Sequence, residues 1–214
     1  IVFDSLAIGM SPFLMNLAAC FIVIIINQGL KKYGGDLAIG AFGIVNRLVF
    51  IVVMIVMGLN QGMQPIAGYN FGAKLYGRVN KVLRLTIIYA TAVTTFGFLV
   101  GMLVPDLVVG IFTSDAELTE LSVTGLRITV MFFPIIGFQM VTSNFFQSIG
   151  MAGKAIFLSL TRQMLILLPC LLVLPQFFGV AGVWYSMPVS DLLASLIALV
   201  MLVCQFRKFR TSPL

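Results

Sequence analysis

Long runs without charge constrain this chain more than any other feature of its sequence. Residues 5–30, 48–73, 85–105 and 128–153 contain no Asp, Glu, Lys or Arg. A helix rises about 1.5 Å per residue, so roughly 20 apolar residues cross the ~30 Å hydrocarbon core of a bilayer. Each run can therefore cross once, and residues 155–206 are long enough to cross twice. With 9% charged residues, the chain is too poor in charge to solvate a water-soluble surface.

The sequence therefore predicts an all-α fold, a polytopic transmembrane bundle of six helices. We expect the helices near residues 5–30, 37–69, 80–104, 116–149, 154–177 and 180–206. Tyr33-Gly34-Gly35-Asp36 predicts a tight turn after the first helix, and the segment from Gly179 to Gly182 predicts another before the last. Ser114-Asp115-Ala116-Glu117 has the pattern of a capping box that opens the fourth helix.

Basic residues of the predicted loops gather on one side of this bundle. That side holds Lys74, Arg78, Lys81, Arg84, Lys154, Arg207, Lys208 and Arg210. The other side holds Lys31 and Lys32 beside the acids Asp36, Asp106, Asp115, Glu117 and Glu120. By the positive-inside rule, the first side and both termini are predicted to be cytoplasmic, in a plasma (inner) membrane. The same rule accounts for the net charge of +6, so no nucleic-acid partner is predicted.

Three ionisable residues fall inside predicted spans: Arg47, Arg162 and Asp191. A charge at the bilayer centre costs at least ~2.5–3.5 kcal/mol, so each is expected to face protein or water. Each is either a structural ion pair or snorkelling group, or a group that lines a transport path. If the last two helices form a hairpin about Gly179, Asp191 and Arg162 differ in depth by roughly 7–8 Å, within reach of an extended Arg. They are predicted to pair.

Amides and hydroxyls form two stripes on the predicted helices. Asn46, Asn60 and Gln64 share an arc on the second helix; the fourth carries Gln139, Ser143 and Gln147 at intervals of four, with Asn144 beside them. Such stripes either join neighbouring helices by hydrogen bonds or line a water-filled cavity. The two stripes together favour the cavity, and these seven residues are its candidate lining.

Prolines interrupt most of the predicted helices. Each removes a backbone donor and frees a carbonyl, which predicts a kink suited to a helix that bends during transport. The predicted kinks are at Pro12, Pro65, Pro134, Pro169 and Pro188.

Catalytic and metal-binding patterns are absent from the sequence. It has no histidine, no Cys/His metal spacing, no phosphate loop and no acid cluster within a span. We therefore expect no enzyme activity, no cofactor and no metal site.

The run from Gly58 to Lys74, GLNQGMQPIAGYNFGAK, leads into a basic loop and is more specific than any periodicity in the chain. It matches the pattern GxxQxxQPxxGYNxGA and so closely resembles the multidrug and toxic compound extrusion (MATE) family. Further similarities follow in order: Ile111 to Asp115, Asn144 to Gly150 with Lys154, and Gly179 to Trp184 followed by Pro188 and Asp191.

The resemblance implies a twelve-helix exporter of drugs or other organic, often cationic, compounds that exchanges them for Na⁺ or H⁺. Residues 1–214 would then be its C-terminal six-helix lobe, with an N-terminal lobe as partner and the substrate cavity between the two. Na⁺-coupled members typically carry acids in the first and fourth helices of this lobe, whereas residues 5–30 and 121–190 here contain none. Coupling would then fall to the N-terminal lobe, or to Asp191.

Two other functions stay open. A flippase for lipid-linked or polysaccharide precursors, from the same broader superfamily, would need several cations for pyrophosphate, and this chain offers Arg47, Arg127 and Arg162. A non-transporting membrane scaffold or enzyme subunit would not need the polar stripes and prolines.

Overall fold

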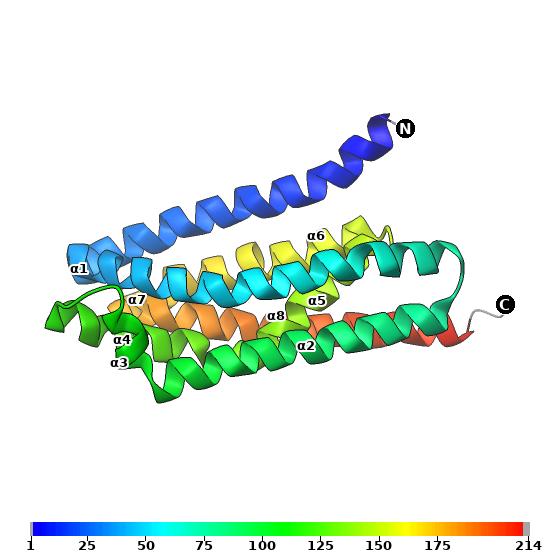
Figure 1. The fold of residues 1–214 in the computed structure, drawn as a ribbon. Helices are drawn as coiled ribbons and strands as arrows, with labels where there is room; N and C mark the ends of the chain where they lie inside the picture. The colour runs from blue at the N-terminus through cyan, green and yellow to red at the C-terminus, as the bar shows by residue number, and fades with distance from the viewer. Residues whose placement is uncertain (1, 212–214) are drawn as a thin grey trace.

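Helices make up almost all of the computed structural model, which describes the backbone of residues 2–211 and the side chains of residues 13–14 and 16–205. Within that range there is no strand, and the all-α prediction is confirmed. The elements are α1 (Val2–Gly72), α2 (Tyr76–Leu103), α3 (Pro105–Gly110), α4 (Ala116–Val130), α5 (Phe133–Ser148), α6 (Ala152–Leu160), the π-helix η1 (Thr161–Leu167), α7 (Leu168–Phe178) and α8 (Val180–Thr211). They run roughly along one axis in an elongated bundle (Figure 1).

Helix α1 folds back on itself. Gly35 leaves the helical conformation with φ 66° and ψ −162°, in the left-handed region that glycine enters without a Cβ clash. The chain reverses there, inside the predicted Tyr33–Asp36 turn, and Figure 1 shows the two halves running in opposite directions. We refer to residues 2–34 as the first arm of α1 and to residues 36–72 as its second arm.

Four helical stretches of the described chain are long and apolar enough to cross a membrane. One of them, Asn16–Gly72, contains the Gly35 reversal and so consists of two antiparallel stretches. The others are Tyr76–Leu103, Ala152–Phe178 and Val180–Gln205, and the bent pair α4–α5 together has the length and composition of one further span. These four to five candidate spans are roughly consistent with the predicted bundle, and the six predicted helix ranges stay predictions.

The fourth helix differs from the prediction of one continuous segment over 116–149. It is broken at Met131–Phe132 into α4 and α5, whose axes differ by 55°. Pro134 lies in the first turn of α5, where its missing N–H costs no helical hydrogen bond. The predicted kink at Pro134 is therefore a full break.

The start of α4 is also capped differently from the prediction. Asp115, not Ser114, is the N-cap: its Oδ1 accepts a hydrogen bond from the Leu118 backbone N–H at 2.8 Å. A further hydrogen bond fixes the backbone of Asp115, because its N–H donates to Thr113 Oγ1 at 3.2 Å. A carboxylate at this position also complements the positive end of the helix.

The other prolines have different outcomes. Pro169 lies in the first turn of α7, directly after η1, whereas Pro65 and Pro188 lie inside continuous helices. Pro12 lies outside the residues whose side chains the structure describes.

The interior consists of two apolar clusters along the bundle. One includes Trp184, 2% exposed, whose ring packs against Phe42 with centroids 5.9 Å apart. The other includes Met63, Phe145 and Phe146. Many apolar side chains still point outward, such as Phe96, which is 69% exposed. An outer surface of this kind suits lipid.

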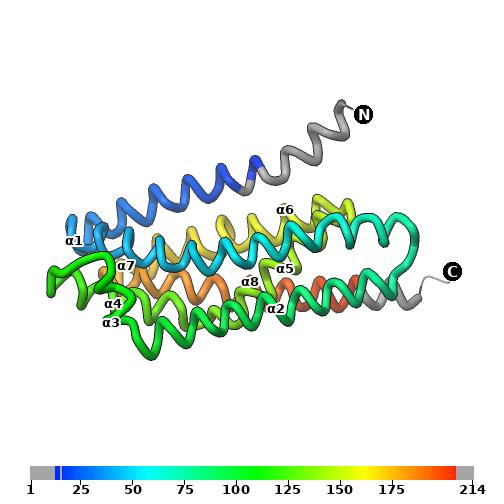
Figure 2. Tube along the Cα trace, in the orientation of Figure 1, coloured from blue at the N-terminus to red at the C-terminus, as the bar shows by residue number. Residues whose placement is uncertain are grey.

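The connections divide between the two ends of the bundle. Figure 2 shows the α1–α2 and α5–α6 connections at one end of the bundle, and the reversal within α1 and the α7–α8 turn at the other. At the first end, Lys154 Nζ contacts Gln205 Oε1 and lies 5.3 Å from the centroid of the Phe146 ring. These contacts join α5, α6 and α8.

We predict that the end with the α1–α2 connection faces the cytoplasm. In a variant whose free cysteines Cys20, Cys170 and Cys204 are replaced, a Tyr76→Cys thiol should resist a membrane-impermeant maleimide applied to intact cells. A Ser114→Cys thiol at the opposite end should react. The reverse labelling pattern would contradict this orientation.

Candidate functional site

A cavity of about 260 Å³ lies inside the bundle between both arms of α1, α4, α5, η1 and α8. Most of its wall is apolar, with side chains such as Phe42, Phe133 and Met140. Its polar lining comes from Asn46, Thr129, Arg162, Ser190 and Asp191. The cavity thus brings together three residues that the sequence singled out: Asn46, Arg162 and Asp191.

Arg162 and Asp191 form an ion pair in this cavity. Arg162 Nε lies 2.7 Å from Asp191 Oδ1, and the side chains are 32% and 6% exposed, respectively. The pairing predicted from the α7–α8 hairpin is therefore present. Each charge removes much of the cost of burying the other, which would be several kcal/mol for a lone ion.

A π-helix positions Arg162. η1 covers Thr161–Leu167, and the Leu168 N–H bonds to the Gln163 carbonyl, five residues back. Such wide turns occur mostly as single insertions in α-helices, frequently at functional sites. Pro169 follows at once and cannot donate to a carbonyl, so the regular helical ladder is already interrupted here. The extra residue sets the direction in which Arg162 leaves its helix.

The α7–α8 hairpin positions Asp191. Gly179 turns the chain with φ 58°, and Gly182 packs so closely on the Leu174 carbonyl that a Cβ there would overlap it. This tight start fixes α8 against α7. The hydroxyls near Asp191 are occupied within α8, because Ser190 donates to the Met187 carbonyl at 2.7 Å and Ser195 to the Asp191 carbonyl at 2.6 Å. Arg162 is thus the partner of the Asp191 carboxylate.

Apart from Asn46, the residues of the two polar stripes do not line this cavity, and the stripes contact each other instead. Gln64 Nε2 donates to Asn144 Oδ1 at 3.3 Å, linking the second arm of α1 to α5. Ser143 Oγ lies 3.2 Å from Ser159 Oγ, linking α5 to α6. Of the seven candidate lining residues, only Asn46 lines this cavity; the others are Asn60, Gln64, Gln139, Ser143, Asn144 and Gln147.

Asn60 is the least satisfied member of these stripes. It is 2% exposed, and neither its Nδ2 nor its Oδ1 has a hydrogen-bond partner among the described residues. A buried amide without partners is costly, which distinguishes Asn60 from the paired Gln64 and Asn144.

Arg47, the third intramembrane charge, is exposed and is not part of the cavity wall. Arg127 on α4 is likewise exposed. Arg162 is therefore the cation of the cavity, and the nearby carboxylate neutralises it.

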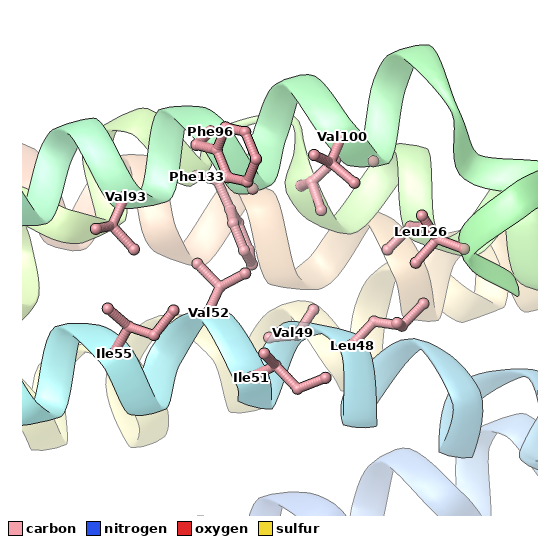
Figure 3. Close-up of a pocket in the computed structure, with 14 residues that line it drawn as sticks. Leu48, Val49, Ile51, Val52, Ile55, Val93, Phe96, Val100, Leu126 and Phe133 are labelled. Atoms are coloured by element: carbon pink, nitrogen blue, oxygen red, sulfur yellow. The ribbon is translucent and has the colours of Figure 1, made fainter. Parts of the chain in front are cut away.

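A second hollow, of about 220 Å³, lies between the second arm of α1, α2 and α4 (Figure 3). Its wall consists of hydrocarbon side chains such as Val52, Val100 and Leu126, with Gly97 and Gly101 between them. It offers no charged or polar side chain, so it cannot orient a polar ligand.

No group of three or more His, Cys, Asp or Glu residues that could hold a metal occurs among the described residues. Thr129 and Ser190 are lining residues that the sequence reasoning missed. Ser190 could have been identified from its position next to Asp191 in the sequence. Thr129 has no comparable local signal.

Comparison with known proteins gives a consistent set of relatives. The family model MatE matches residues 11–172. The multidrug export protein MepA of Staphylococcus aureus (strain MSSA476) is 29% identical over 192 residues, which cover 90% of this chain and 42% of MepA.

Solved structures agree with the fold. A ligand complex of the MATE multidrug transporter DinF-BH superposes with a TM-score of 0.86 and 34% identity, over 99% of this chain and 48% of that one. The outward-facing conformation of a multidrug resistance MATE family transporter superposes with a TM-score of 0.88 over 95% of this chain and 46% of that one. At 18% identity, this second likeness shows the fold alone. The chain spans about half the length of the relatives it matches.

Proposed function

Because the chain belongs to the MatE family, we propose that it forms one half of a secondary active exporter in the plasma membrane. Its substrates are drugs or other organic, often cationic, small molecules, and export is driven by exchange for H⁺ or Na⁺. The observation that carries the proposal is a partly polar cavity, with one neutralised charge pair, inside a bundle whose outer surface suits lipid. MepA is named a multidrug export protein and DinF-BH a multidrug transporter, which supports the substrate class.

The missing partner in this proposal is an N-terminal six-helix lobe, with residues 1–214 as the C-terminal lobe. The length of the relatives supports it, since this chain covers 42% of MepA. The substrate cavity would lie between the lobes. The candidate contacts from this half are the amides along the second arm of α1 and α5, including Asn46 and Gln64. In this arrangement both termini are cytoplasmic.

The coupling cation is assigned to the other lobe. A site for Na⁺ or H⁺ needs a carboxylate whose charge is free to bind it. Asp191 already faces the Arg162 guanidinium at 2.7 Å, so the pair as a whole has no net negative charge. Among the residues with described side chains, the other acids lie next to the Gly35 reversal, in α3 and at the start of α4, and none of them lines the cavity.

The flippase alternative requires a cavity with several cations for a pyrophosphate. Arg47 and Arg127 are exposed outside the described cavity, and Arg162 is paired with Asp191. This distribution favours the exporter.

The exporter is tested by reconstituting the full-length protein that contains this chain into proteoliposomes loaded with a cationic rhodamine dye or ethidium. An imposed proton or Na⁺ gradient should move the dye against its concentration difference. Residues 1–214 expressed alone should confer no drug resistance on an efflux-deficient strain, because one wall of the cavity is missing. Dye movement that ignores both gradients, or resistance from residues 1–214 alone, would contradict the proposal.

A further inference from the structure

The outward face of α2 carries a hollow that transport does not explain. Gly77, Asn80, Lys81, Arg84, Leu85 and Ile88 line a space of about 430 Å³. All six are exposed. They recur at intervals of three and four, so they occupy one stripe along the helix. The buried face of α2, with Val79, Leu83 and Ala90, points the other way, into the bundle.

The stripe changes from basic to apolar along its length. Lys81 and Arg84 lie one helical turn apart, with the Asn80 amide beside them and Gly77 leaving open space above. Leu85 and Ile88 continue it with exposed hydrocarbon, 43% and 50% exposed. A ligand that fills the stripe therefore needs an anionic group at one end and an apolar chain at the other.

The change falls at the expected depth of the membrane surface. Arg84 is the last charged residue before the uncharged run 85–105. Within α2 this run covers residues 85–103, which at ~1.5 Å per residue are about 29 Å long, close to the ~30 Å thickness of the hydrocarbon core. Lys81 and Arg84 then lie among the lipid headgroups, while Leu85 and Ile88 lie against acyl chains.

The two cations have no anionic partner within the described part of the protein. Neither Lys81 nor Arg84 forms an ion pair among the described residues, and the first turn of α2 contains no acid. Among the residues with described side chains, the acids other than Asp191 are Asp36 beside the Gly35 reversal, Asp106 in α3, and Asp115, Glu117 and Glu120 at the start of α4. Figure 1 shows these segments at the end of the bundle opposite the start of α2. The positive end of the α2 helix adds to the same field. This end of α2 thus has an uncompensated positive charge.

We propose that this stripe binds one anionic phospholipid. Its phosphate lies between Lys81 and Arg84, with the Asn80 amide as a further donor, and one acyl chain lies along Leu85 and Ile88. An Arg can donate two hydrogen bonds to one phosphate, and Lys adds a point charge. Basic residues at this depth are the expected recognition elements for anionic headgroups.

The test compares melting midpoints of the purified protein in detergent with added phosphatidylglycerol, phosphatidylcholine of the same acyl chains, or sodium phosphate. At a hundredfold excess over Kd, phosphatidylglycerol should raise the midpoint by roughly 5–10 °C, and the other two should not. Lys81→Gln/Arg84→Gln should lose this shift. Lys81→Arg/Arg84→Lys, which keeps both charges, should retain it.

The matched control is Lys31→Gln/Lys32→Gln, which removes two exposed cations at the opposite end and should retain the shift. An equal shift in the wild type and in Lys81→Gln/Arg84→Gln would overturn the proposal. So would an equal shift with sodium phosphate alone, because the site would then bind a free anion and not a lipid.

Discussion

Replacing Asp191 by Asn is expected to destabilise the protein by about 2–4 kcal/mol, below the ~3–5 kcal/mol of a fully buried pair because Arg162 is partly exposed. In the wild-type protein the Asp191 carboxylate lies 2.7 Å from Arg162 Nε. The variant removes this carboxylate and leaves the guanidinium in the cavity without a counter-ion. Arg162→Gln should cost a similar amount by leaving the carboxylate unpaired. The double variant should cost clearly less than the sum, since it strands neither charge. Thermal unfolding of the three variants in one detergent measures this.

The control is Asp106→Asn, the same change at an exposed acid of α3, which should alter the midpoint little. Strictly additive losses would show that the pair contributes no coupling energy. If Asp191→Asn left the full-length protein stable but abolished dye transport, Asp191 would be a coupling residue and the assignment of coupling to the other lobe would be wrong.

Replacing Gly137 by Ala is expected to cost about 1–3 kcal/mol. A Cβ at Gly137 would lie 2.8 Å from the Ala90 carbonyl oxygen and 2.7 Å from Thr94 Oγ1. The carbonyl belongs to the backbone of α2, so it cannot rotate aside as a side chain would. The helices α2 and α5 must then separate. Thermal unfolding in detergent and the yield of monodisperse protein both report the loss.

Gly58→Ala is the matched control, since nothing lies within 4 Å of its added Cβ. Because alanine favours helix over glycine by roughly 0.5–1 kcal/mol, this variant should be as stable as the wild type or more so. Equal stability of Gly137→Ala and Gly58→Ala would contradict the close approach of α2 and α5.

The sequence predicted those parts of the fold that depend on local signals. Charge-free runs mark membrane crossings because lipid excludes charge, and Gly35 and Gly179 mark turns because they adopt positive φ. The Arg162–Asp191 contact was predicted by comparing how far each residue lies from the turn at Gly179 in a helical hairpin. These predictions need only local residue types and the rise of a helix, and no knowledge of how the helices pack.

What the sequence could not predict depends on packing between helices. Nothing local distinguishes a kink at Pro134 from the 55° break before it, because neighbouring helices set the angle. The amides of the second arm of α1 and of α5 are equally suited to a cavity wall or to each other. Only their placement shows that Gln64 bonds to Asn144. The sequence also could not decide between Ser114 and Asp115 as the N-cap of α4, because both side chains can cap a helix. The structure shows that Asp115 is the cap.

The π-helix at Thr161–Leu167 contributes to the side of the helix on which the Arg162 side chain lies. One extra residue in a helix rotates everything on one side of it by about 100° relative to the other. If the wide turn moved past Arg162 along the chain, its guanidinium would swing from the α8 side to a neighbouring face while most backbone hydrogen bonds persisted. The Asp191 carboxylate would then face the cavity without a counter-ion. In such a shift, a slip of one residue inside a single helix would change the net charge exposed in the cavity.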